Sequence, residues 1–427
     1  MYSLARLCME RGIRISGYDR ESNTYTESLR KMGVNVSYEA DFMTASSATL
    51  VVYSLAIDSR DSELVYTGSL DIPHVSRADF LSYLIEDYKT SIAVSGSHGK
   101  STVTSLIHSM LSLGGRSPTT AVGASISGGE PCSIGGKDVF IYESCEYGDS
   151  FLCMHQSILA ITNIEHDHPD YFKDEGAVRD SFLRCINNTK DFAVLPIDDK
   201  NVRSIINDVK VPYVTYGSAE TADYRYTIDD FLENGSRFSI YHGSNIYTFT
   251  IFEIGLHNVA NAVCAAVTAL EYGIDGEVIT EALLGFKLPK RRLEDIGTYS
   301  GRRVIYDYAH HPTEIAAAIG AVRTWYAETV TVIFKPHTYT RTRALWDGFV
   351  RALSLADYVI LADIYPAREE PIFDITSERL AEQIGDKARY ISNDGELIDA
   401  LSATEGLIIL MGAGELEAYK ARILAEK

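Results

Sequence analysis

The segment Gly-Ser-His-Gly-Lys-Ser-Thr, residues 96–102, brings together the groups that hold a phosphate. A run of small and β-branched residues precedes it, and residues with helical spacing follow it. Glycines let backbone N–H groups approach an anion, the helix N-terminus attracts it, Lys100 can reach the terminal phosphates and Ser101 can ligate Mg²⁺. The usual spacing G-x-x-x-x-G-K-[ST] is broken, because Val94 stands in the place of the first glycine. The loop alone therefore fits either a nucleotide site or a plain strand-to-helix turn.

Side chains that could hold a metal ion follow two later apolar runs. Glu143 ends the first run, and residues 163–168 (Asn-Ile-Glu-His-Asp-His) follow the second. Because a parallel sheet presents its ligands at the carboxyl ends of its strands, we expect these side chains near the glycine-rich loop. Mg²⁺ prefers oxygen ligands, which suits Glu143 and Ser101, whereas a histidine ligand implies a second, softer position. A solvated loop of turn-forming residues is the alternative for 163–168.

The elements that would position these residues alternate along the chain. Short β-branched runs and helical stretches follow one another, which is typical of α/β proteins with parallel sheets. We expect three domains: 1–88, a small α/β unit; 89–287, which opens with the glycine-rich loop; and 288–427, which follows a hinge near 285–292. A chain of 427 residues, 46% of them hydrophobic, can bury two or three separate cores.

Composition argues against several classes of protein. The net charge of -20 disfavours a nucleic-acid or anionic-membrane surface, although it allows a local basic pocket for an anionic substrate. The six cysteines show no C-x-x-C spacing, and neither a signal peptide nor an apolar run of bilayer length is evident. We therefore expect a cytoplasmic protein without nucleic-acid or membrane partners.

A series of segments resembles the successive signatures of the Mur ligase family. In chain order they are GSHGKST, ESCEYGDSFL, TNIEHDHPDYF, GLHNVANAVCA, YDYAHHPTEI and KPHTYTRTRALWDGF. The family's own loop has the form G-[TS]-H-G-K-[TS], so the residue at Val94 agrees with it. The resemblance covers nearly the whole chain and is strongest to the members that join L-alanine to UDP-N-acetylmuramate. It implies an N-terminal Rossmann-like UDP-sugar domain, a central P-loop ATPase-like domain with a parallel sheet, and a C-terminal Rossmann-like domain.

The activity that the resemblance implies is an ATP-dependent, ADP-forming ligation of a carboxylate to an amine in peptidoglycan precursor synthesis. The γ-phosphate of ATP would pass to the lactyl carboxylate of UDP-N-acetylmuramate, and the amine of L-alanine would attack the resulting acyl phosphate. Mg²⁺ is implied beside ATP. Phosphoryl transfer between two anions is mostly a matter of positioning and charge neutralisation, which a lysine, Mg²⁺ and basic residues can provide.

The resemblance also implies roles for individual residues. The ATP-binding set is Gly96, Ser97, His98, Gly99, Lys100, Ser101, Thr102, His257, Asn258 and Asp307. The metal set is Ser101, Glu143 and His168, and the catalytic set is Lys100, His168, His310, Arg341 and Arg343. Lys100 would contact the β- and γ-phosphates, and Asp307 would meet the ribose. Arg341 and Arg343, with His337, would hold the carboxylate of the amino acid.

Several of these residues have a structural alternative. His257 could cap its helix, Arg343 could form a surface ion pair, and Asp307 could stabilise a turn. His257 and Asn258 are otherwise expected on the adenine side, and His310 and its neighbour His311 near the reaction centre.

The chain departs from the family pattern at its start. In the family, a strand and a G-x-G-G-x-G loop that holds the UDP diphosphate precede Met-Ser-Gly-Leu-Ala, whereas this sequence starts with Met-Tyr-Ser-Leu-Ala. We expect the first strand and this loop to be absent, which would truncate the UDP-sugar domain and weaken sugar-nucleotide binding. The acidic E-A-D-E-S-D form is also altered, but Glu143 and Glu146 keep both glutamate positions. Residues 184–189 contain no lysine for carbamylation, so we expect no modified lysine.

Other interpretations stay open. A ligase that attaches a recycled peptide to the same sugar, or a folylpolyglutamate-type ligase, would share the second and third domains. A non-ligating ATP-binding regulatory homologue is less consistent with the segments AHHPTE and HTYTRTR, because a nucleotide sensor needs no clamp for an amino acid. A NAD-dependent dehydrogenase is weaker still, since no G-x-G-x-x-G follows a strand. The choice among alanine, serine and glycine, and the oligomeric state, stay open as well.

Overall fold

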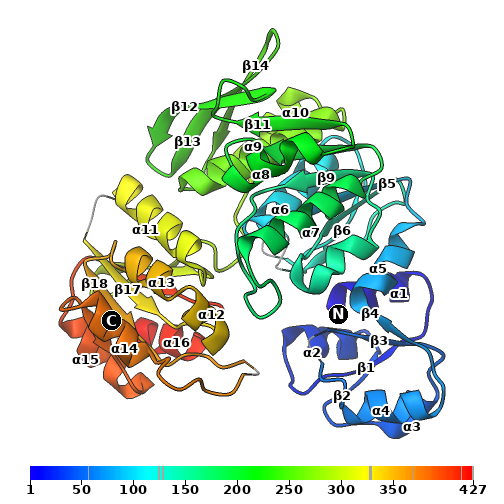
Figure 1. Cartoon of the computed structure of the whole chain (residues 1–427), viewed down its shortest axis with the longest axis horizontal. Helices are drawn as coiled ribbons and strands as arrows, with labels where there is room; N and C mark the ends of the chain where they lie inside the picture. Colours follow the sequence, from blue (N-terminus) through cyan, green and yellow to red (C-terminus); the bar gives the residue numbers. More distant parts are fainter. Residues whose placement is uncertain are drawn as a thin grey trace.

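The computed structural model describes residues 1–55, 57–123, 126, 129–326, 329–367, 369–414 and 416–425. It confirms the predicted α/β class with three successive units, although the exact domain boundaries stay a prediction. Figure 1 shows the blue N-terminal unit and the yellow-to-red C-terminal unit beside the cyan and green central unit. Among the helices of the described residues, none has the length and apolarity needed to cross a membrane.

The N-terminal unit is small and contributes short strands. Its elements are α1 (Tyr2–Glu10), β1 (Ser16–Tyr18), α2 (Thr24–Lys31), β2 (Asn35–Ser37), α3 (Phe42–Ser46), β3 (Val51–Tyr53), α4 (Ser62–Ser69), β4 (His74–Ser76) and α5 (Arg77–Ile85). The strands form two parallel pairs, β1 with β2 and β3 with β4. Leu81 and Leu84 of α5 are buried in the same core as Phe140 of the central unit. The apolar face of α5 therefore fixes this unit against the central one.

The central unit is built on a ten-stranded sheet with the order β14-β13-β12-β11-β10-β9-β5-β8-β6-β7. Its elements are β5 (Thr90–Ser95), α6 (Lys100–Leu113), β6 (Thr119–Ala121), β7 (Cys132–Ser133), β8 (Val139–Glu143), η1 (Tyr147–Cys153), β9 (Ile158–Ile161), α7 (Glu175–Asn187), β10 (Phe192–Pro196), α8 (Lys200–Ile205), η2 (Ile206–Asp208), β11 (Tyr213–Gly217), β12 (Tyr224–Leu232), β13 (Gly235–His242), β14 (Asn245–Ile251), α9 (Leu256–Glu271) and α10 (Gly276–Gly285).

The middle of this sheet positions the glycine-rich loop. β5 pairs in parallel with β8 on one side and β9 on the other, with Val94 opposite Glu143 and Ser95 opposite Ile161. Helices cover both faces of the sheet, so β5 is buried along almost its whole length, with Ile92, Ala93 and Val94 as its apolar centre. The carboxyl ends of β5, β8 and β9 lie at one edge, as the rule for parallel sheets predicts.

The C-terminal unit has a six-stranded sheet with the order β15-β16-β20-β17-β18-β19, parallel except for β15 with β16. Its elements are β15 (Glu294–Tyr299), β16 (Arg302–Asp307), α11 (Pro312–Tyr326), β17 (Val330–Phe334), α12 (Tyr339–Ala344), α13 (Trp346–Leu353), β18 (Tyr358–Leu361), α14 (Ser377–Ile384), β19 (Ala388–Tyr390), η3 (Asp394–Glu396), α15 (Leu397–Ser402), β20 (Leu407–Met411) and α16 (Glu417–Ala425).

The central and C-terminal units are in direct contact through polar side chains. The Thr313 hydroxyl donates to Glu165 at 2.7 Å, and Arg341 donates to Asp167 at 2.9 Å. Farther away, the Trp325 indole N–H donates to the carbonyl of Gly235 at 3.0 Å. The segment that follows β9 therefore faces α11 and α12 across the contact.

Candidate functional site

The glycine-rich loop fits tightly against the segment that follows β9. Gly96 has φ +139°, and an added Cβ there would overlap the Thr162 hydroxyl and lie 2.9 Å from the carbonyl oxygen of Asn163. Gly99 has φ +83°, and a Cβ there would lie 3.1 Å from Cγ of Asn261. The backbone N–H of His98 donates to the Asn163 side chain at 2.9 Å. Both glycines are thus required by backbone conformation and by lack of space.

We expect Gly96→Ala to destabilise the protein by about 2 kcal/mol or more, because conformational strain of about 1 to 3 kcal/mol adds to a clash with backbone atoms. Gly115→Ala is the matched control: Gly115 also has a positive φ of +73°, but a Cβ there would meet no atom within 4 Å. That control should lose only about 1 to 2 kcal/mol. Denaturant unfolding and ATP titration of both variants measure the difference, and equal losses in stability would contradict the packing described here.

Lys100 is anchored inside the loop rather than extended into solvent. Its ammonium group donates to the carbonyl oxygens of Gly96 and Ser97 and to the Glu146 carboxylate, at 2.9 Å from Oε2. The Glu146 side chain is only 3% exposed. Burial opposes the charge of Lys100, but the carboxylate of Glu146 outweighs it and raises the lysine pKa. Lys100 is therefore a permanent cation at the carboxyl edge of the sheet.

The predicted metal set lies around this lysine. Ser101 is buried in the first turn of α6, and Glu143 accepts from the backbone N–H of Gly123 at 2.8 Å. His168 has its Nε2 3.8 Å from a carboxylate oxygen of Glu146. Two oxygen donors and one imidazole are available, which suits Mg²⁺ at the oxygens better than at the nitrogen. The assignment of these residues to Mg²⁺ stays a prediction.

The residues predicted on the nucleoside side serve the local fold. The Asn258 amide donates to the carbonyl of Ile254 at 2.7 Å at the start of α9. Asp307 is 6% exposed, and its two carboxylate oxygens accept from the backbone N–H groups of Leu293 and Ala309, each at 2.7 Å. This arrangement matches the turn role held open for Asp307 above. Contact with adenine or ribose stays a prediction.

His257 and Asp307, both predicted on the nucleoside side, have pKa values that differ from those of free side chains. Burial and the nearby Arg292 guanidinium lower the pKa of His257 to about 4, so this imidazole is neutral at pH 7. Burial raises the pKa of Asp307 to about 6, although Arg292 and two backbone N–H groups oppose the shift.

Of the two arginines predicted to hold the carboxylate of the amino acid, one is buried and the other is exposed. Arg341 is 6% exposed and donates from Nε and Nη2 to the same oxygen of Asp167, both at 2.9 Å, while its Nη1 lies 3.2 Å from His337. Burial opposes ionisation of Asp167, but the Arg341 guanidinium holds its pKa well below the usual range. Arg343, also on α12, is exposed. The structure thus brings Arg341, His337 and Asp167 together, and leaves Arg343 outside that contact.

A cluster of histidines and glutamates joins the glycine-rich loop to the C-terminal unit. His98 Nδ1 lies 3.2 Å from Glu314, and His98 Nε2 lies 3.5 Å from Glu165. His310 Nδ1 lies 3.2 Å from the second oxygen of Glu314. Glu314 was not among the predicted site residues. The available signals were its place in the first turn of α11, three residues after a histidine pair, and in the segment YDYAHHPTEI.

The contact between the two units should weaken at alkaline pH. Burial disfavours the charged form of His98, but the carboxylates of Glu314 and Glu165 outweigh it and raise the His98 pKa from 6.5 to about 10. Because the pKa is raised on folding, this contribution to stability is complete below about pH 6.5 and is lost as the pH rises through about 10. Unfolding free energies of the wild type and of Glu314→Gln between pH 6 and pH 10 test this. The variant should show the smaller loss of stability, and parallel curves would rule out the assignment.

Sequence models of protein families match three stretches of the chain. They are described as the Mur ligase family catalytic domain at residues 1–89, the Mur ligase middle domain at 94–269, and the Mur ligase glutamate ligase domain at 291–414. The UDP-N-acetylmuramate--L-alanine ligase of Caldicellulosiruptor bescii is 35% identical over 427 residues, which cover 97% of this chain and 94% of the relative. The enzyme of the same name from Acetivibrio thermocellus is 35% identical over 440 residues, covering 100% and 94%.

Solved structures share the fold over the whole chain. The crystal structure of a UDP-N-acetylmuramate-alanine ligase from Thermotoga maritima aligns with a TM-score of 0.83 at 23% identity and covers 100% of this chain and 96% of that one. A murein peptide ligase from Psychrobacter arcticus aligns with a TM-score of 0.71 at 21% identity, covering 99% and 95%.

Proposed function

The chain belongs to the Mur ligase family, and we propose that it joins L-alanine to UDP-N-acetylmuramate, with ATP converted to ADP and phosphate. One structural observation supports this proposal most directly. The glycine-rich loop with Lys100 faces the segments that bear His310 and Arg341, so a phosphate at the loop and an amino acid at the C-terminal unit would meet in one space. The names of the relatives that are 35% identical favour L-alanine as the amine.

The loop would bind the phosphates of ATP and stabilise the charge that moves during transfer. The free N–H groups at the start of α6 and the Lys100 ammonium are the donors available for this. The γ-phosphoryl group would pass to the lactyl carboxylate, turning a poor electrophile into an acyl phosphate. The amine of alanine would then attack the acyl carbon, and phosphate would leave as the amide forms.

His310 is suited to take the proton that the amine must lose. Its Nδ1 lies 3.1 Å from the carbonyl oxygen of Tyr308, which places the ring proton on Nδ1 and the lone pair on Nε2. Burial lowers the pKa of His310, although Glu314 opposes the shift, so the ring is a neutral base at pH 7. Arg341 and His337, next to it, would hold the carboxylate of the amino acid.

Mg²⁺ fits the donors at the loop and would be held by Ser101 and Glu143, with His168 as the softer third ligand. When bound, the ion neutralises the phosphate oxygens during transfer. We expect Glu143→Gln to raise the Mg²⁺ concentration for half-maximal activity at least about 10-fold, because one charged ligand is lost. Glu220→Gln, at an exposed glutamate of the same unit, is the control and should change nothing. Equal Mg²⁺ titrations for both variants would refute the assignment of Glu143.

We place the reaction in the cytoplasm, where ATP is available, and the six free thiols are consistent with a reducing compartment. The experiment that tests the function is phosphate release with ATP, Mg²⁺ and UDP-N-acetylmuramate, adding alanine, serine, glycine or a murein tripeptide in turn. Fastest release with L-alanine, together with the amide product, is expected. Fastest release with the tripeptide would instead support a murein peptide ligase, the name that the Psychrobacter arcticus structure carries.

A further inference from the structure

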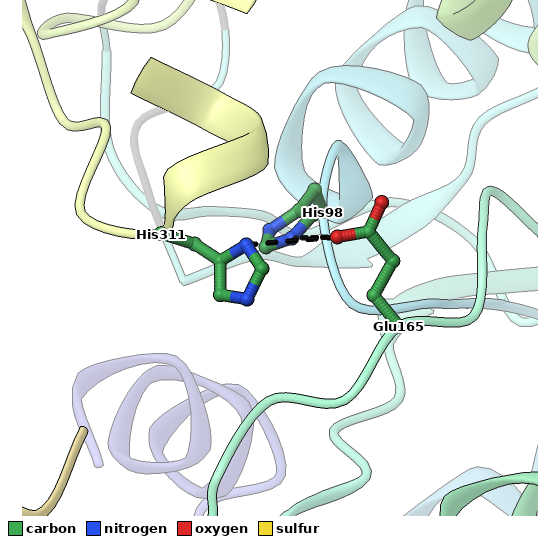
Figure 2. Close-up of side chains that lie close together, drawn as sticks. All are labelled: His98, Glu165 and His311. Carbon is green, nitrogen blue, oxygen red and sulfur yellow. Dashed lines mark ion pairs between the residues drawn. The ribbon is translucent and has the colours of Figure 1, made fainter. Parts of the chain in front are cut away.

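Three potential ligand atoms from two structural units converge beside the glycine-rich loop. Figure 2 shows His98 from the loop, Glu165 from the segment after β9, and His311 from the start of α11 pointing toward one another. The same Glu165 oxygen lies 3.5 Å from His98 Nε2 and 3.5 Å from His311 Nδ1. A tetrahedral zinc ion with bonds of about 2.0 to 2.2 Å holds its ligand atoms about 3.3 to 3.6 Å apart. Both distances therefore already fit a shared metal ion.

The surroundings orient these groups as they do at metal centres. Glu314 lies 3.2 Å from His98 Nδ1 and would hold a proton on that nitrogen, while a metal ion would replace the proton of Nε2, which faces Glu165. His98 Nε2, the ring nitrogen nearest Glu165, is buried and has no hydrogen-bond partner, and the His311 side chain is 7% exposed. Among the residues that the structure describes, this is the only group of three or more His, Cys, Asp or Glu side chains with metal-binding spacing.

We propose that His98, Glu165 and His311 form a site for a divalent transition-metal ion of the zinc class. The bound ion would bridge the glycine-rich loop and the C-terminal unit. Two imidazoles and one carboxylate are borderline ligands that favour zinc over Mg²⁺, so this site differs in chemistry from the oxygen donors Ser101 and Glu143. The fourth position would be filled by water.

Neighbouring groups determine which contacts must change before a metal ion can bind at this site. All ligand atoms lie within 4.8 Å of one another, so the two imidazoles need to approach by no more than about 1.5 Å to complete the tetrahedron. The Thr313 hydroxyl donates to the same Glu165 oxygen at 2.7 Å, and the Thr313 N–H donates to His311 Nδ1 at 3.3 Å. The first bond leaves Glu165 a second lone pair, and the second, longer bond would be exchanged for the metal. The Arg292 guanidinium, 3.6 Å from Glu314, offsets part of the negative charge that favours a cation.

If the metal site is combined with the proposed function, on which this step rests, a bound ion would affect ligation. Its ligands come from both units, so a bound ion would fix the C-terminal unit against the loop. An ion that fixes this contact would oppose any opening of the two units for release of nucleotide after ligation. Zinc should therefore inhibit ligation at saturating Mg²⁺, and a chelator should restore the activity.

Equilibrium dialysis of the full-length protein against Zn²⁺, without nucleotide, tests the binding itself. The wild type should bind one zinc ion per chain, and Co²⁺ in its place should give the intense visible absorption of tetrahedral coordination. Glu165→Gln and His311→Ala should each weaken binding at least about 100-fold, and Glu314→Gln about 10- to 100-fold. His168→Ala, in the predicted Mg²⁺ set, and His155→Ala, at an exposed histidine, should both retain it.

Three results would overturn the site: no zinc bound by the wild type, unchanged affinity in both Glu165→Gln and His311→Ala, or loss of zinc in His168→Ala alone. Glu165→Gln is nearly isosteric, so it keeps the test valid if His311→Ala does not fold, which thermal unfolding would reveal. Zinc binding without amide formation would refute the proposed function and leave the metal site standing. Amide formation without zinc binding would refute the metal site and leave the proposed function standing.

Discussion

Replacing Lys100 with alanine is expected to lower the rate of ligation at least about 10²-fold, because the loop then lacks the lysine ammonium group proposed to neutralise the transferring phosphate. Lys100 is the only lysine or arginine among residues 90–110. Binding of ATP should weaken less than the rate falls, since the backbone N–H groups of the loop remain. Phosphate release and amide formation, measured side by side, give the effect.

A second variant is needed to separate the loss of activity from a loss of stability. Removing Lys100 alone leaves the buried Glu146 carboxylate without its cation, which destabilises a protein by about 3 to 5 kcal/mol. Lys100→Met combined with Glu146→Gln removes both charges and should recover most of the stability, but not the activity. Lys89→Ala, at an exposed lysine just before β5, is the control and should behave as the wild type. Wild-type turnover in the double variant would show that Lys100 does not serve the chemistry.

Arg341→Ala is expected to cause the second large effect. The substitution leaves Asp167 buried without a partner, and losing one member of a buried hydrogen-bonded charge pair costs about 2 to 5 kcal/mol, or about 30-fold to several thousandfold in an equilibrium. We expect kcat/KM for L-alanine to fall by an amount in this range, because Arg341 is the proposed carboxylate ligand and also joins the two units. The KM for ATP should change little.

Two further variants separate these roles of Arg341. Arg341→Met combined with Asp167→Asn should restore the unfolding free energy but not the activity with alanine. Arg351→Ala, at an exposed arginine on α13, is the matched control and should leave both unchanged. Recovery of activity in the double variant would mean that Arg341 acts only as a structural link between the units.

The sequence was sufficient for the features that depend on local pattern. The alternation of elements predicted the α/β class, and the strand-loop-helix pattern located the glycine-rich loop that holds Lys100. The rule that ligands gather at the carboxyl ends of parallel strands placed Glu143 beside the loop, which the pairing of Val94 with Glu143 confirms. Val94 itself is a fully buried strand residue, so no glycine is needed there.

The partners of individual side chains could not be predicted in the same way. Glu146 as the partner of Lys100, Glu314 as the partner of His98 and Asp167 as the partner of Arg341 all depend on contacts between segments far apart in the sequence. Local periodicity carries no information on such contacts. The family resemblance predicts a role for Arg341, but it could not predict that Arg341 is buried against Asp167.

The most direct test of the proposed chemistry follows one oxygen atom. UDP-N-acetylmuramate labelled with ¹⁸O in its lactyl carboxylate is incubated with the protein, ATP, Mg²⁺ and L-alanine, and the released phosphate is analysed by mass spectrometry. An acyl phosphate intermediate predicts one labelled oxygen in each phosphate released, together with an amide that has kept the other. Release of unlabelled phosphate would show that water, rather than the lactyl carboxylate, takes the phosphoryl group, and would contradict the proposed ligation.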